Sequence, residues 1–237
     1  MNTKYLWLLG ILIGFSACNE PEDVLADFNI LPEVVEELPQ LSAGSLDFSN
    51  YVALGASFTA GYTDGAVFKA SQENSFPNIL SQQFAKVGGG TFTQPLMNDN
   101  FGGLAVGGTR IQNPRLVFGG AGPVPLESII GPVTVTTDLA VNNPTGPFNN
   151  LGVPGAKSFH LVAPDYGNIA GVLAGLANPY FVRMASSPST TMLTDAIAQS
   201  PTFFTLSEIG GNDVLSYATS GGTGVNQLGN LDPSTYG

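Results

Sequence analysis

The stretch at positions 51–61, Y-V-A-L-G-A-S-F-T-A-G, constrains the fold more than any other part of the chain. Its first five residues, Tyr51 to Gly55, form a short apolar run that predicts a buried strand ending at a glycine. Ser57 follows two residues later, among small residues that leave the turn open around its side chain. Such a turn can present a serine at the end of a sheet, although an ordinary turn serine is the alternative interpretation. The stretch therefore predicts a sheet with Ser57 at its carboxyl edge.

The residues after Ser57 predict a strand–helix unit. Apolar residues recur at helical spacing from Phe76 to Phe84, Pro77 suits a first turn, and three glycines at 88–90 would end the helix. A strand followed by such a helix returns as a parallel strand through a right-handed crossover. Positions 168–176 and 191–199 are further expected helices.

Positions 88–147 differ in composition, because glycine and proline recur throughout them. Short β-like runs occur at 115–118 and 132–137. A structureless loop of this length is unusual inside a compact domain. We therefore expect an insertion of short strands and turns, lying over or beside the carboxyl end of the sheet.

Two further stretches place polar groups after short apolar runs. At 149–158, N-N-L-G-V-P-G-A-K-S, a strand runs into a turn in which Gly155 can bring a bare backbone N–H close to a ligand, although a turn that starts a helix is the alternative. At 202–213 a buried-type strand leads to G-G-N-D. The Asn212 amide is a neutral donor suited to holding a developing negative charge, whereas we expect Asp213 to brace the loop.

The three stretches resemble, in order, the sequence blocks of the SGNH or GDSL hydrolase family. The blocks are G-D-S-x-(T/S)-x-G at 55–61, N-x-G-x-(S/P)-G-A at 150–156 and G-x-N-D at 210–213. The resemblance implies an α/β, flavodoxin-like three-layer sandwich with a mostly parallel sheet. It also implies hydrolysis of an ester in an acylated lipid or carbohydrate, with no metal or other cofactor. Ser57 would be the nucleophile, and the N–H groups of Ser57 and Gly155 with the Asn212 amide would form the oxyanion hole.

The chain departs from the family in two places. Ala56 stands where the family has an aspartate, which puts the rigidity of the turn in doubt. The family's base is a histidine in a D-x-x-H block near the C-terminus, whereas the only histidine here is His160, with Lys157 three residues before it. We expect His160 to be a surface or helix-start residue rather than the base, and serine at its ordinary pKa is a poor nucleophile without one.

The loop-like sequence at 221–237 suggests an N-terminal fragment with an incomplete sheet. The continuation would carry the Asp-His block, so the fragment itself is expected to be inactive. The rival function is that of a non-catalytic surface lipoprotein that binds glycan or lipid through the same cleft.

The first 48 residues predict export and anchoring. An apolar run at 5–15 follows Lys4 and is too short to span a bilayer, so residues 1–17 are predicted to be a signal peptide. The run ends in a lipobox-like F-S-A-C whose Cys18 is the only cysteine, although a chance cysteine after an ordinary cleavage site is the alternative. Residues 18–48 are acidic and proline-containing, as in an extended tether, and 49–237 form the hydrolase-like domain.

The predicted location is the cell envelope, with lipid anchoring to the outer membrane. An acidic start after Cys18 resembles the surface-export signals of lipoproteins in the Bacteroidetes. The formal net charge of −11 and the lack of a basic cluster exclude nucleic acid as a partner, since phosphate binding needs clustered Lys and Arg.

Overall fold

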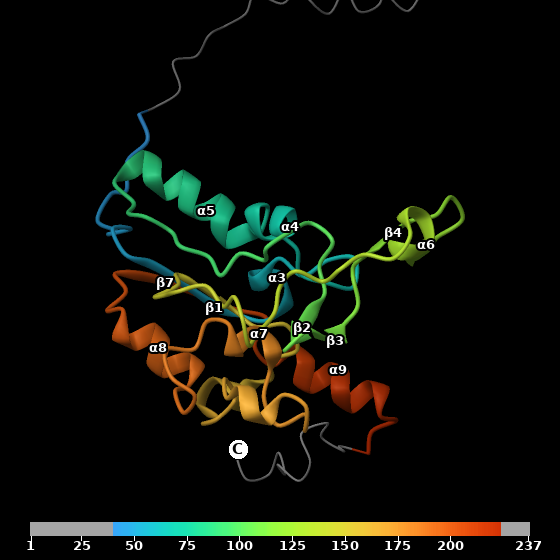
Figure 1. The fold of residues 1–237 in the computed structure, drawn as a ribbon. Coiled ribbons are helices and arrows are strands. Elements are labelled where there is room, and N and C mark those ends of the chain that lie inside the picture. The colour runs from blue at the N-terminus through green and yellow to red at the C-terminus, as the bar shows by residue number, and fades with distance from the viewer. Residues whose placement is uncertain (1–39, 224–237) are drawn as a thin grey trace, which may run out of the picture. The chain divides into compact units, whose positions relative to one another are not determined.

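A computed structural model of the chain describes residues 40–223. Its centre is a parallel sheet of three strands in the order β6-β1-β7 (Figure 1). These are β1 (Tyr51–Gly55), β6 (Asn150–Gly152) and β7 (Phe203–Ser207). The register pairs Gly55 with Gly152 on one side and with Ser207 on the other, so the three strands end at one edge. The predicted α/β class and parallel sheet are confirmed.

Helices cover both faces of this sheet (Figure 1). On one face lies α5 (Phe76–Phe84), whose Phe84 ring stacks on Phe48 at 4.1 Å and meets Phe203 edge-on at 5.4 Å. On the other face, α7 (Pro179–Val182) and α8 (Met192–Ala198) contribute to a buried cluster that includes Val52 and Leu54 of β1. Apolar residues on alternating sides of one strand thus build two core layers.

Shorter elements connect the strands to these layers. The helix α3 (Ser57–Ala60) begins at the end of β1, α4 (Lys69–Glu73) precedes α5, and a 3₁₀ turn, Ala85–Val87, ends it. After β7 the chain forms α9 (Gly211–Thr219). The expected helix at 191–199 is confirmed as α8, with the Thr191 side chain accepting a hydrogen bond from the Thr194 N–H.

The expected helix at 168–176 is wrong. Only a 3₁₀ turn, Ile169–Gly171, forms there, followed by further turns. Gly175 has a φ of +71°, which no helix accommodates, and the Asn168 side chain accepts from the Ala170 N–H in a local turn instead. The glycines and alanines of this segment bury too little surface to hold a helix in place.

The insertion consists of short strands and turns, as predicted. It holds the hairpin of β2 (Leu104–Val106) with β3 (Thr109–Gln112), the hairpin of β4 (Leu116–Phe118) with β5 (Pro123–Pro125), and the helix α6 (Glu127–Ile130). The β-like run at 132–137 is not a strand. Its Thr136 carbonyl accepts from the Asn98 side chain and its Thr137 hydroxyl from the Asn98 N–H, while the Thr137 carbonyl accepts from the Ala105 N–H.

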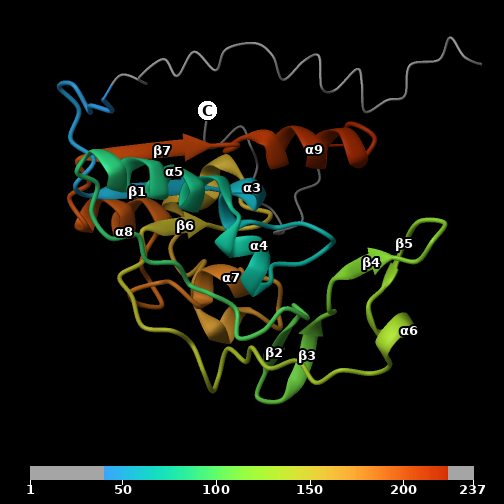
Figure 2. The ribbon, with the colours of Figure 1, turned by 90° about the horizontal axis from the view of Figure 1, so that it is seen from above.

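The insertion is attached to the segment that follows α3. The Leu116 N–H donates to the Asp64 carbonyl at 2.7 Å, and Leu104 shares a buried cluster with Ala60 and Val67. Figure 2 shows the β4–β5 hairpin on the side toward which the central strands point. The expected position beside the carboxyl end of the sheet agrees with this arrangement.

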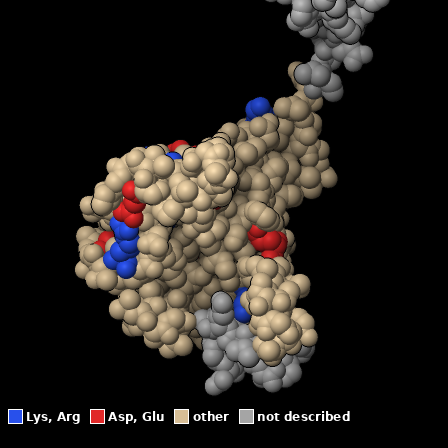
Figure 3. Space-filling view, turned by 90° about the vertical axis from the view of Figure 1, so that its right-hand side faces the viewer, with Lys and Arg blue, Asp and Glu red and all other residues tan. Residues whose placement is uncertain are grey.

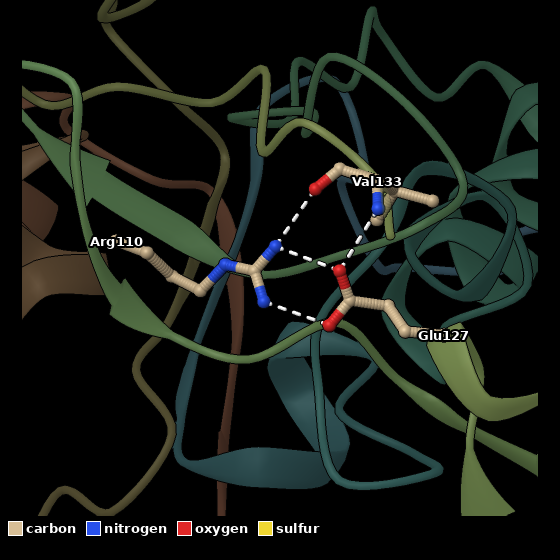
Figure 4. A network of polar contacts seen from close by, with 3 residues as sticks. All are labelled: Arg110, Glu127 and Val133. Atoms are coloured by element: carbon tan, nitrogen blue, oxygen red, sulfur yellow. Dashed lines mark hydrogen bonds and ion pairs between the residues drawn. The ribbon is translucent and has the colours of Figure 1, made fainter. Parts of the chain in front are cut away.

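A bidentate ion pair braces the outer part of the insertion (Figure 4). Arg110 of β3 donates to both carboxylate oxygens of Glu127 at 2.8 and 2.9 Å and to the Val133 carbonyl at 2.7 Å. The Val133 N–H returns a bond to Glu127 at 2.8 Å. The Arg110 bonds lower the pKa of Glu127 to about 2, so this carboxylate stays charged at physiological pH.

The strand β7 forms an edge, pairing within residues 40–223 only with β1. Phe204 and Leu206, on the face that β1 uses for its α8-side core, are 61% and 55% exposed. Val214, Leu215 and Tyr217 of α9 are exposed as well. Further strands beyond β7 remain a prediction.

The signal peptide, Cys18 and the tether as far as residue 39 lie outside the described residues. Within the described part, no helix is both long and apolar enough to cross a membrane.

Candidate active site

Ser57 is the first residue of α3, and two glycines fix where this helix lies. A Cβ on Gly55 would stand 2.0 Å from Thr59 Oγ1 and 2.8 Å from the Ser207 carbonyl oxygen. A Cβ on Gly152 would stand 2.3 Å from the Ala60 nitrogen. Since no real Cβ tolerates such distances, glycine at 55 and 152 lets α3 fold back against the ends of β1 and β6.

Ser57 itself is half-buried, and its hydroxyl is available. Its carbonyl accepts from the Tyr62 N–H at 2.8 Å, which closes the turn after α3. In the described part of the chain neither the Ser57 hydroxyl nor its backbone N–H makes a hydrogen bond. Both groups that acyl transfer requires of this residue, a nucleophile and an oxyanion donor, are therefore unoccupied.

Sequence reasoning missed Glu208, which follows β7 directly. Its carboxylate accepts from the N–H groups of Ala56 at 2.9 Å, Phe58 at 2.8 Å and Thr59 at 2.8 Å. The Thr59 hydroxyl adds a fourth bond at 2.8 Å. The turn around Ala56 is thus held by a carboxylate that follows β7. The only sequence signal was an acidic residue beside the G-G-N-D block.

The loop after β6 places Gly155 with an open N–H. Its φ is +79°, a left-handed conformation, and nothing lies within 4 Å of where a Cβ would stand. Among residues 40–223 no acceptor bonds its N–H. An exposed, uncommitted N–H on glycine is what the expected oxyanion donor requires.

The asparagine and aspartate of α9 bridge to this loop. Asn212 Nδ2 donates to the Ala156 carbonyl at 2.9 Å, which uses one of its two protons. Asp213 accepts from the Ser158 N–H and hydroxyl, each at 2.9 Å, and so braces the loop as expected. Side chains of α9 therefore tie the second and third sequence stretches together.

Strand register brings Ser57 to the same edge. The Val153 N–H continues the β6–β1 ladder by donating to the Gly55 carbonyl at 3.0 Å, and Gly55 also pairs with Ser207. The predicted site residues thus all follow strand ends at one edge of the sheet. Few charged side chains occur on the molecular face shown in Figure 3.

His160 does not lie on the surface, so that part of the expectation is wrong, although it does lie in a 3₁₀ turn, Ser158–Val162. Its side chain is 2% exposed, and its ring stacks on Tyr166 with centroids 4.1 Å apart. Its Nδ1 accepts from the Lys157 N–H at 2.8 Å. Burial, followed by the charge of Lys157, lowers the pKa of His160 to about 4. A neutral imidazole bonded in this way is a core residue rather than a base for Ser57.

This burial predicts a pH-dependent stability. In the unfolded chain His160 binds a proton near its ordinary pKa of 6.5, whereas the folded protein resists protonation down to about 4. The unfolded state therefore binds more protons as the pH falls, and the free energy of unfolding drops by about 2 kcal/mol between pH 8 and pH 5. Urea unfolding at the two pH values measures the drop, and the His160→Phe variant should lack this share of it. An equal drop in both proteins would contradict the assignment.

Two hollows of similar volume are candidates for a binding site. A groove of about 510 Å³ runs beside α3 and is lined by Phe58, Tyr62, Phe76 and Ser207, among others. A cavity of about 570 Å³ lies by α8 and the 144–148 loop. The charged groups at that cavity are already bonded, with Asp195 accepting from Ser186 and Thr190 and Arg183 donating to the Pro95 and Leu96 carbonyls. The groove is thus the hollow that adjoins the serine turn.

Searches against protein-family models, curated proteins and solved structures find no match for this chain. The geometry of these residues is therefore the basis for a functional assignment.

Proposed function

We propose that this chain carries the nucleophile and the oxyanion donors of an SGNH/GDSL-type serine esterase, on a flavodoxin-like three-layer fold. One observation carries the proposal. Each expected donor, the N–H groups of Ser57 and Gly155 and the Asn212 amide, retains at least one N–H that is not bonded among residues 40–223. Unused donors after neighbouring strand ends are what an oxyanion hole needs, because they cost no reorganisation when charge develops.

The reaction follows from these roles. Ser57 Oγ attacks the carbonyl carbon of an ester in an acylated lipid or carbohydrate, and its proton passes to a base. The carbonyl oxygen becomes an oxyanion held by the three donors. Collapse expels the alcohol with a proton from that base, and water then hydrolyses the acyl group from Ser57. His160 is not placed to act as this base, so the chain of residues 1–237 is expected to turn over esters slowly.

The direct test is covalent labelling with an alkyl fluorophosphonate, followed by intact mass and peptide mapping. We expect Ser57 to be labelled in preference to every other serine, and labelling at this position to be lost in Ser57→Ala. Hydrolysis of p-nitrophenyl acetate by the same chain should be small, and added imidazole should raise the Ser57 labelling rate by supplying a base. Uniform, slow labelling of many serines would overturn the proposal.

One observation favours a second candidate. Phe58, next to Ser57, is 72% exposed and lines the groove beside α3. A surface lipoprotein that binds lipid or glycan without catalysis would use such a groove. This candidate would be favoured if the protein is retained on lipid vesicles or glycans while Ser57 resists labelling. The Phe58→Ala variant should then be retained less.

We further propose lipid anchoring at Cys18 in the cell envelope, which makes the membrane a partner. The sequence basis is the short apolar run ending at a lipobox-like site. Cys18→Ser is expected to move the protein from the membrane fraction to the soluble fraction and to remove the acyl mass from the mature N-terminus. More than one acyl chain is expected, because a single chain binds membranes only marginally. A Cys18→Ser protein that still fractionates with membranes, beside a wild type without acyl mass, would contradict the assignment.

A further inference from the structure

The geometry points to Glu208 as a positioning residue that shapes the Ser57 turn for reaction and links it to the loop of Asn212. This inference rests on the proposed function, because it assigns Glu208 a role in the reactivity of Ser57. Glu208 touches no reacting atom in this role. It acts through the backbone that carries the nucleophile.

The Glu208 carboxylate accepts from three of the four consecutive backbone N–H groups at positions 56–59. It accepts from the N–H groups of Ala56, Phe58 and Thr59 at 2.8–2.9 Å. In the part of the chain that the structure describes, the Ser57 N–H is the one amide of this group left unbonded. Glu208 therefore fixes the turn through its neighbours and keeps free the single amide that an oxyanion would use.

A residue of β6 also holds α3 in place. The Asn150 side chain, 3% exposed, donates to the Thr59 carbonyl at 2.9 Å. Helices as short as the four residues of α3 do not persist on their own, so tertiary contacts decide their geometry. Glu208, directly after β7, and Asn150 of β6 thus hold α3 between the two strands that flank β1.

The backbone of Glu208 joins the nucleophile to the oxyanion asparagine. Glu208 is a non-glycine residue with a φ of 54°, a left-handed conformation that the surroundings must enforce. Its carbonyl accepts from the Gly211 N–H at 3.0 Å, in the turn that leads into α9 and Asn212. One residue therefore sets both the Ser57 turn and the start of the Asn212 helix.

The negative charge of Glu208 and its positioning role have opposite expected effects on the reactivity of Ser57, so an experiment can separate them. A carboxylate close to a developing oxyanion repels it. If that repulsion dominated, Glu208→Gln would raise the reactivity of Ser57. If positioning dominates, the same change lowers reactivity, because Gln has a donor where Phe58 N–H needs an acceptor.

The experiment measures the rate of Ser57 labelling by an alkyl fluorophosphonate beside the melting temperature of each variant. We expect Glu208→Gln to slow labelling about tenfold and Glu208→Ala about a hundredfold, since small displacements of reacting groups carry such costs. Asp195→Asn is the matched control. Its carboxylate also accepts several bonds, from Ser186 and Thr190, but in α8 and away from the turn. It should lower the melting temperature with less than a threefold effect on labelling.

A second pair keeps the test decisive if Glu208 variants fail to fold. Thr59→Val removes only the hydroxyl bond to Glu208 and should slow labelling several-fold, whereas Thr59→Ser retains that bond and should restore the rate. If wild-type labelling is specific for Ser57 but the Glu208 variants react at the same rate or faster, the inference about Glu208 is overturned and the proposed function is not. If the Glu208 variants do not fold, an unchanged labelling rate in Thr59→Val has the same consequence. Absence of Ser57-specific labelling in the wild type would overturn the proposed function and the role of Glu208 with it.

Discussion

Replacing Asn212 by alanine is expected to lower the rate of Ser57 labelling by about 10²–10³, the usual cost of losing one oxyanion donor. The Asn212 amide donates one proton to the Ala156 carbonyl and has a second proton that the proposed oxyanion could use. Its neutral charge and its place at the start of α9 favour this role over a purely structural one. The rate constant for fluorophosphonate labelling measures the loss.

The structure offers a matched control for this change. Asn178 Nδ2 donates to the Pro154 carbonyl at 2.9 Å, so it braces the same loop from another side without being an expected donor. Asn178→Ala should reduce the melting temperature while changing the labelling rate by less than about tenfold. Equal rate losses in the two variants would mean that Asn212 only braces the loop.

The second large effect is expected at Gly152. A methyl group there would meet three backbone atoms of α3, the Ala60 nitrogen at 2.3 Å, the Thr59 carbonyl carbon at 2.6 Å and the Ala60 Cα at 2.7 Å. Backbone cannot rotate away as a side chain can, so α3 must shift from β6. Gly152→Ala should cost about 1–3 kcal/mol or more, as overpacking does in cores. Urea unfolding measures this cost, and Ser57 labelling should fall with it.

Gly122→Ala supplies the control, because a methyl group on Gly122 would have no atom within 4 Å and the residue has no positive φ. Its substitution should change the free energy of unfolding by no more than about 0.5 kcal/mol. If Gly152→Ala were equally mild, α3 would not be held against β6 as described.

Much of the fold followed from local patterns. The run at Tyr51–Gly55 is fully buried in the middle of the sheet, where continuous apolar sequence is typical of a parallel strand. The helix from Phe76 was predicted by its spacing and by Pro77 in the first turn. The helix expected at 168–176 did not form, because Gly175 has a positive φ and the Asn168 side chain bonds the local backbone.

The candidate site divides in the same way. The sequence by itself determined which residues follow the strand ends, Ser57, Gly155 and Asn212, because each is encoded next to its own short apolar run. Only the tertiary structure decided that Glu208 holds the Ser57 turn and that His160 is buried on Tyr166. Those contacts depend on which strands pair and on which rings enclose a side chain. Glu208 lies 150 residues from Phe58 in the chain, and a local sequence pattern cannot predict a contact between residues so far apart.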